Sequence, residues 1–104
     1  MLSNAQTDKV RSELSTIRAR IEEIEGEIKK TDYEIARVRD EIEEENDIRS
    51  SPGENQAFYF SVSRSIAKLE RELDKHYAAK SELIVNSRAL RSRRNALYSK
   101  LVEN

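Results

Sequence analysis

The sequence lacks cysteine and is poor in proline, glycine and aromatic residues. Without cysteine, the chain can form neither disulfides nor thiolate metal sites. One proline, two glycines and 6% aromatic residues provide little material for turns or a compact core, whereas 38% of the residues are charged. This composition is typical of long, solvated helices, so the predicted fold class is all-α.

Long hydrophobic runs are also absent. No stretch approaches the roughly 20 apolar residues that cross a bilayer, and the N-terminal residues lack the basic start and hydrophobic middle of a signal peptide. We therefore expect no membrane span and a cytoplasmic location, with leaderless export left open. Because the chain has a single histidine and no cysteine, we expect neither a metal nor a cofactor.

A regular apolar stripe runs from Val10 to Ile42. Its members are spaced alternately four and three residues apart, which is the heptad pattern of a coiled coil. A stripe this narrow needs a partner helix. The positions that form it are Val10, Leu14, Ile17, Ile21, Ile24, Ile28, Thr31, Ile35, Val38 and Ile42.

Capping signals set the expected helix boundaries. Ser3 and Gln6 have the form of a capping box, which predicts a first helix over about 4–49. Ser51, Pro52 and Gly53 end that helix and start another, giving a turn at 50–53 and a second helix over about 53–102. We predict a single domain, 1–104, that forms an antiparallel coiled-coil αα-hairpin. Self-association or a partner protein is expected to complete it to a bundle, because 104 residues with thin stripes bury little surface.

The two stripes also predict how the helices align. The second helix repeats the heptad spacing, although Lys80, Ser87 and Arg94 occupy core positions. Most apolar positions of the two helices face each other if the chain folds back on itself with Pro52 at the midpoint, and we call this alignment the register that pivots on Pro52. In that register Leu97 faces Thr7.

No enzyme signature is present. The many glutamates lie on solvated helix positions, where nothing raises their pKa and no cleft holds a substrate. His76 falls in the seam, which indicates a core histidine or, alternatively, a pH-responsive layer. We expect a chain that is not an enzyme and that has no small-molecule substrate.

Two apolar features of the second helix are candidate contacts for a protein partner. Phe58, Tyr59 and Phe60 are consecutive, so they cannot all face the first helix. Phe58 and Phe60 are expected either to seal the turn or to dock a partner. Beside the seam runs a second stripe that the first helix offers nothing to cover. It consists of Tyr77, Ile84 and Tyr98.

Positive charge collects where the two chain termini meet in the predicted hairpin. Residues 1–20 and 87–104 contain nine Lys or Arg against three acidic residues, a net charge of +6. Arg88, Arg91 and Arg94 are therefore candidate contacts, most simply for a protein. Nucleic acid is the alternative, but no aromatic residue interleaves this arginine run and no recognition motif is present.

A helical hairpin of this length with a glycine in its bend resembles the small Trp-x-Gly substrates and partner proteins of type VII secretion. It is similar in the same way to the charged helical stalk proteins of flagellar and type III export. Ser51 and Pro52 precede the bend glycine here in place of tryptophan, and Tyr98 is followed four residues later by Val102 in place of an acid. The resemblance implies a small chaperone or secreted hairpin of a bacterial export system.

Three classes of function remain from the sequence. The first is a non-enzymatic interaction module, adaptor or structural subunit of a larger assembly. The second is the export hairpin, and the third is a nucleic-acid-associated protein that uses residues 88–94.

Overall fold

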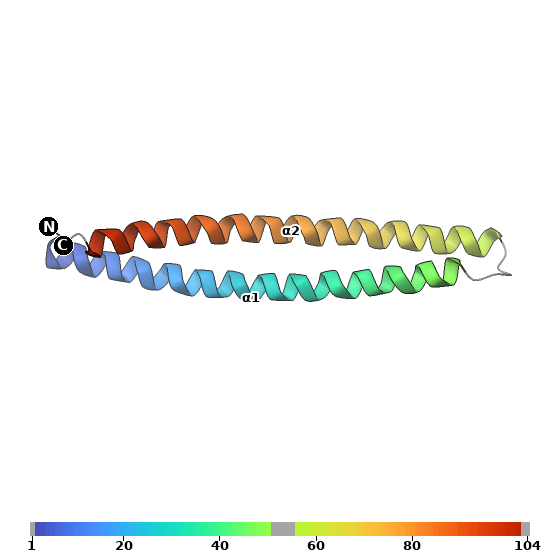
Figure 1. Ribbon diagram of the computed structural model, residues 1–104, viewed down its shortest axis with the longest axis horizontal. Helices are drawn as coiled ribbons and strands as arrows, with labels where there is room; N and C mark the ends of the chain where they lie inside the picture. Colours follow the sequence, from blue (N-terminus) through green and yellow to red (C-terminus); the bar gives the residue numbers. More distant parts are fainter. Residues whose placement is uncertain (1, 51–55, 103–104) are drawn as a thin grey trace. The chain divides into compact units, whose positions relative to one another are not determined.

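The computed structural model describes residues 2–50 and 56–102, and within these ranges the chain forms two helices and no strand. Helix α1 spans Asn4–Arg49 and helix α2 spans Gln56–Val102 (Figure 1). The helices pack against each other in opposite directions, which confirms the predicted all-α pair of antiparallel helices. Completion to a bundle stays a prediction. Residues 51–53 of the predicted turn, and the first residues predicted for the second helix, lie outside the described residues.

The start of α1 is closed by a reciprocal pair of hydrogen bonds. The Ser3 backbone N–H donates to Gln6 Oε1 at 2.8 Å, and the Gln6 backbone N–H donates to Ser3 Oγ at 3.1 Å. These bonds satisfy two of the donors that a helix N-terminus leaves without partners. The capping box predicted from the sequence is therefore present, and α1 begins at the residue after its serine.

The chain divides into two compact units, each containing a segment of α1 and a segment of α2. The first unit is Met1–Lys29 with Glu82–Asn104, and the second unit is Lys30–Ser81. In the first unit Leu2, Leu90, Tyr98 and Leu101 pack against a buried cluster, which consists of Val10, Leu14, Ile17, Ile21 and Leu97. The second unit buries Ile35, Val38, Val62 and Ile66. Burial of each such side chain contributes about 1.5–3 kcal/mol, so the seam is the main source of stability.

Contacts between α1 and α2 flank this cluster on both sides. Arg93 Nε donates to Glu13 Oε1 at 2.9 Å. On the other side the Arg18 guanidinium lies 5.4 Å from the centre of the Tyr98 ring and donates a hydrogen bond to the Tyr98 hydroxyl. Each contact joins a residue of α1 to a residue of α2 at a similar height along the helix axis. Together the two contacts therefore limit how the helices can be aligned.

The register of the first unit differs from the predicted one. Counting along both helices from the Glu13 contact places Leu14 level with Ser92, and counting from the Arg18 contact places it level with Val102. Leu97 lies midway between them and shares the buried cluster with Leu14. The predicted pairing of Leu97 with Thr7 is therefore wrong, by about one heptad of seven residues.

The second unit is displaced in the same sense. Lys80 Nζ lies 2.6 Å from Asp32 Oδ1, and Arg37 Nη2 lies 3.0 Å from Glu72 Oε1. The predicted register places Asp32 level with Glu72, eight residues from Lys80, which is about 12 Å along the axis at 1.5 Å per residue. The observed ion pair indicates that Lys80 lies near the height of Asp32 instead.

The register makes a prediction that paired nitroxide labels can check. The chain has no cysteine, so labels can be attached to introduced cysteines without interference. If Leu14 is level with Leu97, the height of Arg18 along the helix axis differs from that of Arg91 by two residues, or about 3 Å. It differs from the height of Ile84 by nine residues, or about 14 Å. We expect a shorter distance for labels at 18 and 91 than for labels at 18 and 84. The register that pivots on Pro52 gives the reverse order.

Neither α1 nor α2, over the residues that the structure describes, contains a segment long and apolar enough to cross a membrane.

Candidate interaction surfaces

The first turns of α2 expose three aromatic side chains, which we call the aromatic cluster: Phe58, Tyr59 and Phe60. They are 36%, 48% and 53% exposed. The Tyr59 and Phe60 rings meet edge to face, with centres 6.1 Å apart, and the Arg49 guanidinium lies 6.0 Å from the centre of the Tyr59 ring. Three consecutive residues point in directions about 100° apart on a helix, so one seam cannot cover all of them. The cluster is a large apolar feature of the second unit that faces water.

The predicted stripe is covered to different degrees along its length. Tyr77, in the second unit, is 38% exposed. Ile84, in the first unit, is half-buried, and the adjacent Val85 is 61% exposed. Tyr98 packs against the buried cluster of the first unit, beneath the Arg18 guanidinium. Of the three members of the stripe, Tyr77 is therefore the exposed one, whereas Ile84 and Tyr98 are each half-buried.

The arginines of the first unit are largely engaged within the chain. Arg91 donates to Ser87 Oγ at 3.2 Å and forms an ion pair with Glu25. Arg94 is half-buried at a seam position, and its Nε has no hydrogen-bond partner among the described residues. Arg88 is exposed. Arg94 Nη2 donates to Asn95 Oδ1 at 3.5 Å. Of these predicted contacts, Arg88 is therefore the one with neither an ion pair nor a side-chain hydrogen bond among residues 2–50 and 56–102.

Sequence reasoning missed an ion-pair network around Arg37 in the second unit. The Arg37 guanidinium lies 2.8 Å from Glu34, 2.6 Å from Glu41 and 3.0 Å from Glu72 on α2. These carboxylates, Glu34 foremost, raise the pKa of Arg37 above its ordinary value. His76 Nε2, which lacks a hydrogen-bond partner among the described residues, is 3.6 Å from the same Glu72. The spacing of Glu34 and Glu41 from Arg37 was a signal for the helical pairs, but the contact with Glu72 depends on the register.

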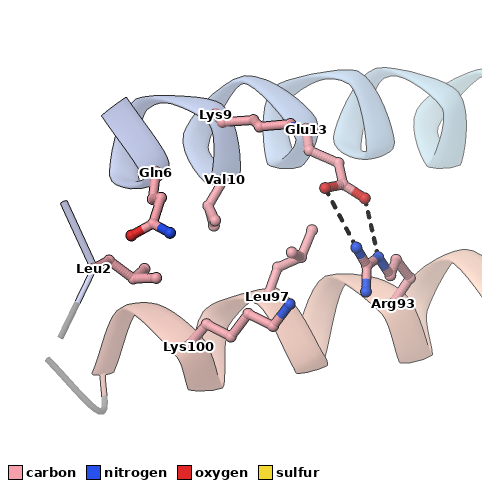
Figure 2. A pocket seen from close by; sticks show the side chains of 8 residues that line it. All are labelled: Leu2, Gln6, Lys9, Val10, Glu13, Arg93, Leu97 and Lys100. Carbon is pink, nitrogen blue, oxygen red and sulfur yellow. Dashed lines mark hydrogen bonds and ion pairs between the residues drawn. The ribbon is translucent and has the colours of Figure 1, made fainter. Parts of the chain in front are cut away.

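A groove of about 280 Å³ lies between the two helices of the first unit. In Figure 2, Val10 of α1 and Leu97 of α2 point toward each other, and the Glu13–Arg93 ion pair bridges the helices beside them. The groove therefore combines an apolar floor with a charged rim, which suits contact with an apolar side chain. It is lined by Leu2, Gln6, Lys9, Val10, Glu13, Arg93, Leu97 and Lys100.

Neither metal-ligand geometry nor similarity assigns a chemistry to these surfaces. No group of three or more His, Cys, Asp or Glu side chains is arranged to hold a metal ion within the described parts of the chain. In comparisons with known proteins, no family model, no curated protein and no solved structure matches the chain. Each surface is therefore characterised by the exposure, charge and contacts of its side chains.

Proposed function

We propose that this chain is a non-enzymatic, cytoplasmic interaction module, an adaptor or structural subunit that presents helical surfaces to another protein. The observation that carries the proposal is the exposure of the aromatic cluster at the start of α2. Full burial of a phenylalanine side chain is worth about 1.5–3 kcal/mol, so a partner that covers these rings gains much of its affinity there. Aromatic anchors of this kind dominate the energetics of many protein interfaces.

Tyr77 and Ile84 supply further contact area on the same helix. A tyrosine provides a wide apolar ring and a hydroxyl, which suits a surface that is wet when free and dry when bound. The proposed partner surface therefore includes the aromatic cluster together with Tyr77 and Ile84, each in its own unit.

The nucleic-acid alternative that uses residues 88–94 has less support from the side chains. A phosphate contact needs a cation that is not already neutralised, and Arg91 and Arg93 pair with Glu25 and Glu13. Nucleic-acid binding would fall steeply with added salt, whereas binding through aromatic anchors would not. The export-hairpin alternative predicts a binding partner of similar size to the chain.

Site-specific photocross-linking in the source cells tests the interaction module. A photoreactive residue at Phe60 or Tyr77 should give a discrete adduct with a protein. The control is the same residue at Ala79, which is exposed and lies on the other flank of α2 from Tyr77. Discrete adducts from the two aromatic positions, and none from the control, support the proposal. Equal and diffuse labelling from all three positions would contradict it.

A further inference from the structure

The second unit carries two rows of exposed charges that have no partners among residues 2–50 and 56–102. One row is on α1, and we call it the acidic face: Asp40, Glu43 and Glu44. The other is on α2, and we call it the basic face: Arg64, Lys68, Arg71 and Lys75. All seven side chains are exposed, and none forms an ion pair or hydrogen bond among the described residues.

The two faces point away from the seam. Asp40 follows the buried Val38 by two residues, which places it about 160° around α1 at about 100° per residue. Arg71 follows the buried Ile66 by five residues, which places it about 140° around α2. Since one face is on the outside of each helix, the acidic face and the basic face cannot meet within one unit.

The faces nevertheless lie at matching heights. Counting from the Asp32–Lys80 and Arg37–Glu72 contacts places Asp40 level with residues 69–72, a range that contains Arg71. The same count places Glu44 level with residues 65–68, a range that ends at Lys68. A second copy set beside the first without any shift along the axis therefore brings opposite charges together.

The first unit shows the same complementarity. Its register, with Leu14 level with Leu97, places Glu22 within one residue of the height of Arg88. Both side chains are exposed and neither has an ion pair among the described residues.

The same register places Gly26 level with Val85, which is 61% exposed. A Cβ added to Gly26 would meet no atom within 4 Å, so this position leaves space for a neighbouring helix to approach closely. The exposed Val85 of another copy would fit against it.

We propose that the partner of these outer surfaces is a second copy of this chain, with the acidic face of one copy docked on the basic face of the next. This inference rests on the proposed interaction function and names one partner for it. Asp40 then pairs with Arg71 of the neighbour, and Glu44 with Lys68. The net charge of −1 gives copies almost no mutual repulsion. Because each copy keeps one acidic and one basic face unoccupied, the contact is heterologous and extends as concentration rises.

Sedimentation velocity on the full chain tests the pairing. At low ionic strength the average mass should rise with concentration, and it should return toward the monomer value at about 1 M salt, where charges are screened beyond about 3 Å. Lys68→Glu with Arg71→Glu, or Asp40→Lys with Glu44→Lys, should each weaken association about tenfold or more, because attraction becomes repulsion. An equimolar mixture of the two double variants should restore association, since each supplies the face that the other needs.

Arg11→Glu with Lys30→Glu is the matched control, because it makes the same charge change at exposed positions that are at least ten residues from the acidic face on the same helix. This control should associate like the native chain. Association that survives the reversals, or a mixture that stays monomeric, overturns the inference. A chain that stays monomeric while its basic face binds a short DNA duplex overturns it too and identifies a polyanion as the partner. In either case the photocross-linking at Phe60 and Tyr77 still decides the proposed function separately.

Discussion

Replacing Val38 with aspartate is expected to destabilise the second unit strongly. Val38 is 0% exposed, so the substitution would place an unpaired carboxylate in the seam between α1 and α2. An uncompensated buried charge costs about 3 kcal/mol or more. Each 1 kcal/mol shifts the melting temperature of a domain this small by about 4–8 °C, so the midpoint should fall by about 12 °C or more in a circular-dichroism melt.

Ala36→Asp provides the matched control for this substitution. Ala36 is exposed, two residues away on the same helix, and it receives the same new charge. The change in unfolding free energy should stay within about 0.5 kcal/mol, as is usual for surface substitutions. If the two variants melted alike, Val38 would not lie in a buried seam.

The sequence was sufficient to predict most of the seam of α1. Of the ten positions that the heptad spacing marks, seven are buried: Val10, Leu14, Ile17, Ile21, Ile24, Ile35 and Val38. The other three, Ile28, Thr31 and Ile42, are half-buried. Such patterns are local, because the spacing of apolar residues within one helix decides which face seeks a partner. The capping box at Ser3 is local in the same way, since its hydrogen bonds join residues three apart.

The register could not be obtained from the same pattern. A seam that repeats every seven residues looks alike when one helix slides by a heptad, since apolar positions still meet apolar positions. What differs is which charges meet on the flanks, such as Lys80 with Asp32 and Glu25 with Arg91. Each such pair contributes only about 0–1 kcal/mol, so its effect on alignment is hard to weigh from the sequence.

The register also decides which charged side chains of the candidate surfaces are available to a partner. The exposure of an aromatic run follows from helix geometry, because three consecutive side chains spread around the helix. Whether Arg91 is available to a partner depends on which residue of α1 lies beside it, and therefore on the register. The complementary heights of the acidic face and the basic face are visible only once α1 and α2 are aligned.

Truncating Leu97 to alanine is expected to be among the most damaging changes in the first unit. Leu97 is 1% exposed and belongs to the buried cluster of that unit. Replacement of a buried leucine by alanine typically costs about 2–5 kcal/mol, through lost transfer energy and the cavity that remains. Val102→Ala is the control on the same helix, because Val102 is 84% exposed and should lose little on truncation. Urea unfolding followed by circular dichroism measures both changes.

A double-mutant cycle on the same residue separates the observed register from the one that pivots on Pro52. In the structure Leu97 lies level with Leu14, and both belong to one buried cluster, so Leu14→Ala and Leu97→Ala should be non-additive by about 0.5–3 kcal/mol. Thr7→Ala and Leu97→Ala should instead add to within about 0.5 kcal/mol, because residues without shared contacts act independently. Strong coupling to Thr7 together with additivity at Leu14 would return the helices to the predicted register.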